Sequence, residues 1–146
     1  LNIAQLADPA EGYTNVALLP GAGQQAVDLR GVWPWPDNAF SEVRACEVVE
    51  HLPDKIRTMN ELWRVTRPGG TVEIRVPTTD GPAAWADPTH VSYWNRRSFL
   101  YFEAGNPYRE RFARSYGIAA KFQVLGERVE ATADGPHLTI ALRSIK

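Results

Sequence analysis

The apolar residues of this chain gather in short runs that are separated by turn-forming residues. Four such runs lie at residues 1–4, 14–19, 26–29 and 42–46, and each has the length of a strand rather than of a helix. A fifth run, at residues 71–76, is rich in β-branched side chains. The pattern predicts a sheet whose strands are short and largely buried.

One segment has the periodicity of a helix. Between residues 52 and 66, the apolar side chains recur every three or four positions and fall on one face. Pro53 suits the first helical position, and Asp54 places a negative charge at the positive end of the helix dipole. We therefore expect a helix over residues 52–66, which the Pro-Gly-Gly sequence at residues 68–70 ends.

The second half of the chain predicts shorter helices and a hairpin. Residues 96–103 predict a short helix, and the mixed charges of residues 109–114 are typical of a solvated helix face. Residues 122–131 and 137–145 predict two strands joined around Asp134-Gly135-Pro136. Strands that alternate with helices and close in a hairpin predict an α/β fold with a doubly wound, mostly parallel sheet and one reversed edge strand.

Length and composition limit the class of protein. The 146 residues suffice for one domain, so we expect a single domain over residues 1–146. A net charge of -1 gives no reason to expect a nucleic acid as the main partner. No apolar run is long enough to span a membrane, and the lone Cys46 cannot form an internal disulfide, so we expect a cytoplasmic protein. Leu1 already lies within the first expected strand, which is consistent with a few native residues before it.

Three motifs in the middle of the chain are the most informative. They are Trp33-Pro34-Trp35-Pro36-Asp37-Asn38-Ala39-Phe40-Ser41-Glu42-Val43, then Glu50-His51-Leu52-Pro53, then Arg67-Pro68-Gly69-Gly70-Thr71. In this order they resemble the middle of the class I S-adenosylmethionine-dependent methyltransferases of the type 11 kind, and the likeness runs from Leu1 to about Phe102. The resemblance implies a Rossmann-like fold. It also implies transfer of a methyl group from S-adenosylmethionine to a small-molecule acceptor, such as the hydroxyl of a sugar or metabolite.

The resemblance assigns a set of cofactor-binding positions at the ends of the expected strands, where open α/β sheets place their ligands. In the family, a glycine-rich turn after the first strand lies against the methionine part of the cofactor. A carboxylate after the third strand faces the adenine amino group. The positions of this chain that match these features, or the crevice edge after the fourth strand, are Asn2, Ala4, Asp28, Leu29, Cys46, Glu47 and Val48.

Four positions depart from the family pattern. Ala4 and Leu6 stand where the family has glycines, which tolerate positive φ and let a ligand approach the backbone. Ala17 and Leu19 lie where the family has an acid that binds the ribose hydroxyls. These departures favour weak binding of S-adenosylmethionine. They also support an alternative function, a non-catalytic methyltransferase-like module that kept the fold for binding or assembly.

Three residues are candidates for contact with the acceptor. His51 precedes the expected helix and suits a general base at neutral pH, the alternative being that Glu50 and His51 fix the turn by hydrogen bonds. Asp87 and His90 belong to a D-P-x-H motif that recurs in small-molecule methyltransferases, where it would bind or deprotonate an acceptor hydroxyl. The histidines lack the spacing of a metal-ligand set, so no metal centre is expected, and His137 is interpreted as structural.

Two further features have a structural interpretation. Residues 21–26 match the dinucleotide pattern G-x-G-x-x-A, but no helix is expected after them. A surface turn is therefore predicted, and a nucleotide-binding oxidoreductase is disfavoured. The aromatic residues between Tyr93 and Phe102 are expected to form core and lid, with stacking of a planar acceptor on Trp94 as the alternative.

Overall fold

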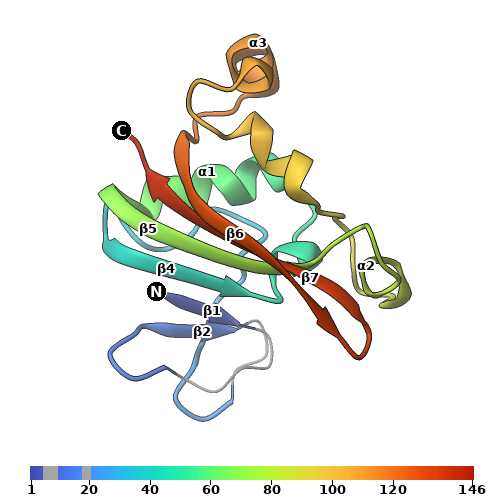
Figure 1. Ribbon diagram of the computed structural model, residues 1–146. Coiled ribbons are helices and arrows are strands. Elements are labelled where there is room, and N and C mark those ends of the chain that lie inside the picture. The colour runs from blue at the N-terminus through green and yellow to red at the C-terminus, as the bar shows by residue number, and fades with distance from the viewer. Residues whose placement is uncertain (5–9, 18–20) are drawn as a thin grey trace.

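The computed structural model describes residues 1–4, 10–17 and 21–146, whose strands form one seven-stranded sheet (Figure 1). The strand order is β3-β2-β1-β4-β5-β7-β6, so the chain winds outward from β1 in both directions, as in a doubly wound sheet. The strands are β1 (Asn2–Ala4), β2 (Asn15–Ala17), β3 (Gln25–Ala26), β4 (Phe40–Cys46), β5 (Thr66–Pro77), β6 (Phe122–Thr132) and β7 (Gly135–Ser144). The predicted α/β fold with a C-terminal hairpin is confirmed.

The sequence predicted that the reversed strand lies at the edge of the sheet. In the structure it lies one strand inside the edge. Neighbouring strands from β3 to β5 are parallel, whereas β7 runs antiparallel to both β5 and β6. Because β6 is antiparallel to β7, it is parallel to β5 and forms the edge itself. The hairpin therefore enters the sheet with its second strand inside.

The main helix, α1 (Lys55–Val65), begins three residues later than the sequence predicted. Asp54 is the N-cap, because its side chain accepts a hydrogen bond of 2.9 Å from the backbone N–H of Arg57. Pro53 thus precedes the cap. The residues before it form a single turn of 3-10 helix, η1 (Val49–His51), which directly follows β4.

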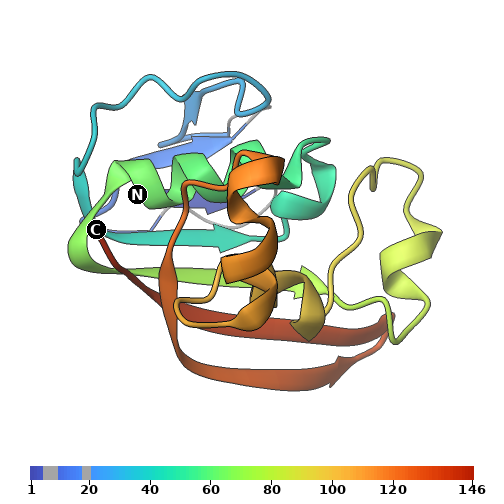
Figure 2. The ribbon, with the colours of Figure 1, turned by 90° about the horizontal axis from the view of Figure 1, so that it is seen from above.

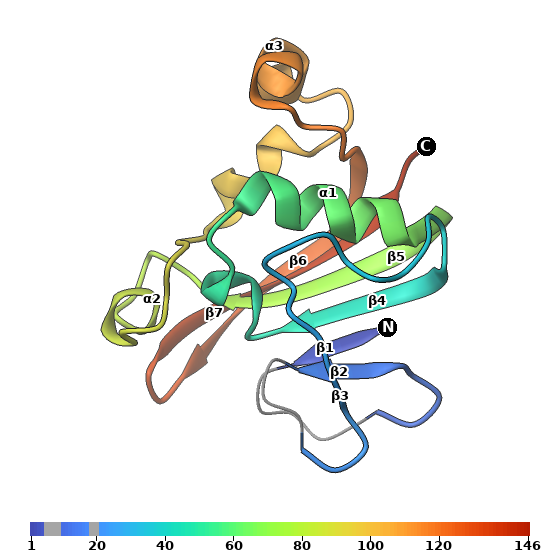
Figure 3. The ribbon, with the colours of Figure 1, turned by 180° about the vertical axis from the view of Figure 1, so that it is seen from behind.

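The hydrophobic core lies between α1 and the central strands. Met59, Leu62 and Val65 of α1 are fully buried, and so are Val72 and Ile74 of β5. Figures 2 and 3 show α1 and the long β3–β4 connection on the same face of the sheet. Burial of these side chains ties the helix to the strands whose ends form the crevice.

An ion-paired cluster holds the β3–β4 connection against α1. The carboxylate of Glu61 accepts a hydrogen bond of 2.8 Å from the backbone N–H of Trp33 and two of 2.7 Å from Arg64. Arg64 also donates to the carbonyl oxygen of Trp35 and pairs with Asp37 at 2.9 Å. The Trp-Pro-Trp-Pro segment is therefore a fixed cover over one face of the sheet.

The opposite face of the sheet, turned toward the viewer in Figure 1, carries no helix among the described residues. Its side chains are polar, because Glu42, Arg44 and Glu73 project there from the two central strands. Arg44 pairs with Glu42 at 2.8 Å and lies over the ring of Tyr13. Such a face is stable in water without a covering layer.

The connection from β5 to β6 contains short helices that frame one end of the sheet. The expected loop after β5 includes α2 (Ala83–Ala86), and the helix expected at residues 96–103 is the 3-10 helix η2 (Arg96–Tyr101). Residues 109–114 lie in α3 (Pro107–Tyr116), which has no buried residue, so the predicted solvated helix face is confirmed. In the part of the chain that the structure describes, no helix is long and apolar enough to cross a membrane.

Two expectations about aromatic residues are settled by burial. Trp94 is fully buried, with its indole N–H donating 2.9 Å to the hydroxyl of Ser92, so stacking of an acceptor on Trp94 is excluded. Trp63 is only half-buried at the rim of α1. Its indole N–H donates to the carbonyl oxygen of Ile145, so this member of the apolar face predicted for residues 52–66 is only partly covered.

Candidate functional site

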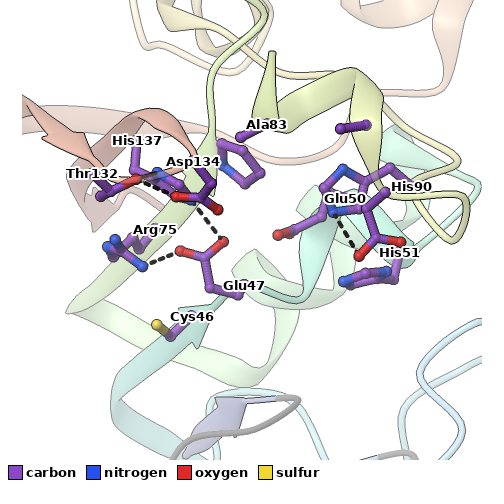
Figure 4. A pocket seen from close by; sticks show the side chains of 13 residues that line it. Cys46, Glu47, Glu50, His51, Arg75, Ala83, His90, Thr132, Asp134 and His137 are labelled. Atoms are coloured by element: carbon purple, nitrogen blue, oxygen red, sulfur yellow. Dashed lines mark hydrogen bonds and ion pairs between the residues drawn. The ribbon is translucent and has the colours of Figure 1, made fainter. Parts of the chain in front are cut away.

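A cavity of about 650 Å³ opens at the carboxyl ends of β4 and β5. Its walls come from the turn after β4, η1, the end of β5, α2 with the loop after it, and the turn of the β6–β7 hairpin (Figure 4). This is the edge at which parallel α/β sheets place ligands. The cavity gathers titratable side chains from segments that lie far apart in the sequence.

One side of the cavity is an ion-paired group around Glu47. This residue follows β4 and has a φ of 50°, which lies in the left-handed region that non-glycine residues seldom adopt. Its carboxylate forms an ion pair with Arg75 of β5 and lies 3.5 Å from Nε2 of His137. The ring of His137 also contacts Thr132, whose hydroxyl donates to Asp134. The turn at Glu47 thus aims a carboxylate into the crevice.

The other side of the cavity contains Glu50, which is 2% exposed. Neither carboxylate oxygen of Glu50 has a hydrogen bond of good geometry within the described residues. Burial, with a contribution from the carboxylate of Glu47, raises the pKa of Glu50 to about 8. A buried carboxyl group without a partner is costly, so its retention here calls for a functional explanation.

His51 and His90 face each other across the same part of the cavity, with ring centroids 4.9 Å apart. Nδ1 of His51 lies 3.0 Å from the hydroxyl oxygen of Thr89 and 3.3 Å from its carbonyl oxygen. Nδ1 of His90 lies 3.1 Å from the carbonyl oxygen of Ala84. Burial lowers the pKa of His51, and the hydrogen bond to Thr89 opposes that effect.

Asp87 completes a short polar chain with these histidines. Its carboxylate accepts hydrogen bonds from the backbone N–H and the hydroxyl of Thr89, and these bonds hold its pKa below the ordinary value. One of its oxygens lies 4.0 Å from Nε2 of His90. The predicted grouping of His51, Asp87 and His90 is therefore present in the structure, since all three line one cavity.

Two of the seven predicted cofactor-binding residues share this cavity. Cys46 and Glu47 line it, whereas Val48 packs against the core. Burial raises the pKa of the Cys46 thiol, which disfavours the thiolate form. The remaining positions, Asn2, Ala4, Asp28 and Leu29, do not line the cavity.

Those remaining positions lie along or beside the β1 half of the sheet. Asn2 and Ala4 are buried in β1, and the side chain of Asn2 donates 2.8 Å to that of Asn15. Leu29 is buried in the core. Asp28 is exposed, and Arg30 donates to both of its oxygens at 2.9 and 2.8 Å, which lowers the pKa of Asp28 to about 2.

S-adenosylmethionine fits the described residues of this edge only in part. Ala4 is small enough to let a ligand approach the end of β1, and Asp28 offers a carboxylate beyond β3. Ala17, the last residue of β2, has no side-chain oxygen for the ribose hydroxyls. Leu6 and Leu19 lie outside the described residues. The fit is therefore incomplete at the ribose.

Sequence reasoning missed several residues of the cavity. Arg75 was treated only as part of a buried strand, and His137 was interpreted as structural, yet both contact Glu47. Pairing of β5 with β7 places Pro77 opposite His137, which is a contact between distant segments. The available signal was the charge of Arg75, which with Glu73 interrupts a run of β-branched residues.

Comparisons with known proteins find methyltransferases. The family model described as a methyltransferase domain matches residues 7–74. An uncharacterised methyltransferase of Schizosaccharomyces pombe is 31% identical over 103 residues, covering 68% of this chain and 36% of the relative. The demethylmenaquinone methyltransferase of Geobacillus stearothermophilus is 32% identical over 84 residues, covering 56% and 33%. The chain spans about a third of the length of these curated relatives.

A solved structure with a similar fold is also a methyltransferase. The structure of the Burkholderia thailandensis 1,6-didemethyltoxoflavin-N1-methyltransferase, with bound 1,6-didemethyltoxoflavin and S-adenosylhomocysteine, superimposes with a TM-score of 0.60 at 12% identity. The match covers 90% of this chain and 60% of that one. The chain thus matches the methyltransferase domain family over residues 7–74, and it has the fold of the class I S-adenosylmethionine-dependent methyltransferases that its motifs resemble.

Proposed function

We propose that this chain transfers a methyl group from S-adenosylmethionine to a small-molecule acceptor that binds in the cavity beside β4 and β5. The observation that carries the proposal is the convergence of His51, Asp87 and His90 on one cavity at the carboxyl edge of a methyltransferase sheet. A structural neighbour, the toxoflavin-precursor methyltransferase, was solved with a small-molecule ligand, which supports this class of acceptor.

The chain's own residues bind and orient the acceptor and hold its proton. Nδ1 of His51 faces the hydroxyl of Thr89, and that hydroxyl donates to Asp87. Because the Thr89 proton is directed at Asp87, the Thr89 oxygen accepts from His51, and Nε2 of the neutral ring carries the lone pair. His51 would take the acceptor's proton at Nε2, and the Asp87 carboxylate would stabilise the resulting imidazolium through Thr89.

The cofactor would lie at the ends of β1 and β4, with Ala4, Asp28, Leu29, Cys46, Glu47 and Val48 as its surroundings. When bound, it would supply the methyl group on a sulfonium centre. The main contribution of such a site is to hold the reacting atoms in one geometry, because the methyl group is already activated.

A test of the proposal is isothermal titration of the purified chain with S-adenosylhomocysteine, followed by an assay of S-adenosylhomocysteine release from S-adenosylmethionine with hydroxylated small molecules. Binding and acceptor-dependent release are expected. If S-adenosylhomocysteine does not bind at millimolar concentration, the proposal fails. The alternative of a non-catalytic module is then favoured, as the missing carboxylate at Ala17 suggests.

A further inference from the structure

Three potential metal ligands meet at one point of the cavity. A carboxylate oxygen of Glu50 and one ring nitrogen from each of His51 and His90 lie within 4.8 Å of one another. Figure 4 shows Glu50, His51 and His90 on the same wall of the cavity. This cluster could not be predicted from the sequence, because His90 lies 39 positions beyond His51.

Backbone hydrogen bonds fix this juxtaposition. The carbonyl oxygen of Glu50 accepts from the backbone N–H groups of Val91 and Ser92 at 2.9 and 3.0 Å. The hydroxyl of Ser92 also donates 2.9 Å to the carbonyl oxygen of Val49. The loop that carries His90 is therefore joined directly to η1, which carries the other two side chains.

The hydrogen bonds of the two imidazoles are made by Nδ1 and leave each Nε2 available to ligate, with an oxygen of Asp87 4.0 Å from Nε2 of His90. A carbonyl oxygen can only accept, so Nδ1 of His90 carries the proton that it donates to Ala84. Nδ1 of His51 donates to Thr89 in the same way. Metal-binding histidines usually have this arrangement, in which one ring N–H is held by a carbonyl or carboxylate and the other nitrogen faces the ion.

Glu50 provides an independent observation. Its carboxyl group is buried, directed into the cavity, and without a hydrogen bond of good geometry in the described part of the chain. A cation between Glu50 and the two Nε2 atoms would satisfy it.

We propose that Glu50, His51 and His90 form a binding site for a divalent transition-metal ion of the Zn²⁺ class. Two imidazole nitrogens and one carboxylate form a donor set suited to Zn²⁺, with one position left for an oxygen ligand from the cavity. Ligands of a tetrahedral Zn²⁺ lie about 3.3 Å apart, so modest side-chain rotations would close the cluster around the ion.

The site does not depend on the proposed methyl transfer. With the ion bound, His51 and His90 would act as ligands rather than as proton acceptors, and an acceptor hydroxyl would be activated by the ion instead. Without the ion, the role of His51 as a base is unaffected. Metal binding and methyl transfer are therefore separate results, and either one can fail alone.

The test begins with the purified chain, stripped of metal by a chelator and dialysed. It is titrated with ZnCl₂ by calorimetry and with CoCl₂ by visible absorption, which reports the coordination of Co²⁺. One equivalent should bind, and Zn²⁺ should displace Co²⁺. Glu50→Gln, His51→Asn and His90→Asn should each weaken binding at least 10-fold, since even the loss of a residue that only orients a ligand typically weakens it 10–100-fold.

His137→Asn is the matched control, because His137 lines the same cavity but lies outside the cluster. It should bind Zn²⁺ like the parent. Should a variant fail to fold, nitrogen-resolved NMR of the parent's imidazoles gives the answer directly. Zn²⁺ should shift Nε2 of His51 and His90 and leave His137 unchanged. Absence of stoichiometric binding, or binding that the three substitutions leave intact, would overturn the proposal.

Discussion

At the scale of single residues, Glu61 is the clearest case of a charge that the fold requires. Burial opposes its ionisation, but the hydrogen bonds from Arg64 and from the backbone of Trp33 outweigh burial and lower the pKa of Glu61. Arg64 in turn pairs with Asp37. Because Glu61 joins α1 to the Trp-Pro-Trp-Pro segment, its ionisation stabilises a contact between distant parts of the chain.

The sign of this linkage gives a prediction for acid unfolding. Since the folded-state pKa of Glu61 lies below that of the unfolded chain, its stabilisation is complete above the ordinary pKa of about 4.3 and is lost as the pH falls below it. Glu61→Gln should lower the free energy of unfolding at pH 7 by about 1–3 kcal/mol and flatten its dependence on pH below 5. Urea unfolding at several pH values measures both, and an unchanged acid slope would contradict the assignment.

Ala17 gives a second prediction at this scale. It ends β2 where the family has a ribose-binding acid, so Ala17→Asp should tighten binding of S-adenosylhomocysteine. A hydrogen bond to a charged group contributes about 1.5–3 kcal/mol, or roughly 10–100-fold in affinity. Ala17→Asn is the matched control for size, and its gain should be smaller. Calorimetry is the measurement. Equal affinities of parent and Asp variant, at equal melting temperature, would show that the missing carboxylate does not limit binding.

At the scale of elements, hydrophobic periodicity predicted which helices and strands exist better than it predicted where they begin. The face of α1 was predicted, but its start was set by the Asp54 side chain, which caps the helix after Pro53. The strand β5 begins five residues before the predicted Thr71, because Thr66 already pairs with Phe40 of β4. Gly70 permits this path, since a Cβ there would lie 2.8 Å from the carbonyl oxygen of Ser41. Such boundaries depend on pairing between segments, which a local pattern does not contain.

The packing of α1 gives a prediction for Leu62, which is fully buried against the sheet. Leu62→Ala should lower the free energy of unfolding by about 2–5 kcal/mol, because it removes apolar contacts and leaves a cavity. Arg57→Ala, on the exposed side of the same helix, should change it by less than about 1 kcal/mol. Chemical denaturation of both variants makes the comparison. Similar losses in the two variants would mean that the buried face has been assigned wrongly.

At the scale of the whole molecule, the sequence predicted which segments carry the site but not how their side chains meet. The D-P-x-H motif was identified from resemblance and His51 from its place before the expected helix, and the loop after β5 does bring His90 to His51. The state of Glu50 could not be predicted, because its burial results from the packing of the 87–92 loop over η1. Contacts of Arg75 and His137 with Glu47 likewise follow from the register between β5 and β7.

The cavity lies on the β5 side of the carboxyl edge of the sheet and does not include the β1 side. This separation can be tested. His90 lines the cavity on the β5 side, whereas Ala4 and Asp28 lie on the β1 side and outside the cavity. His90→Ala should therefore leave the affinity for S-adenosylhomocysteine within about twofold, while turnover falls by about 10²–10⁴, the usual contribution of a positioned acid-base group. The same outcome follows if His90 holds a metal ion that activates the acceptor. Calorimetry gives the first quantity and the rate of S-adenosylhomocysteine release gives the second.

His137→Asn separates loss of this group from general damage to the cavity, because it alters the opposite wall. A parallel loss of cofactor affinity and turnover in His90→Ala would show that the two halves form one site, and the separate acceptor cavity would then have to be abandoned.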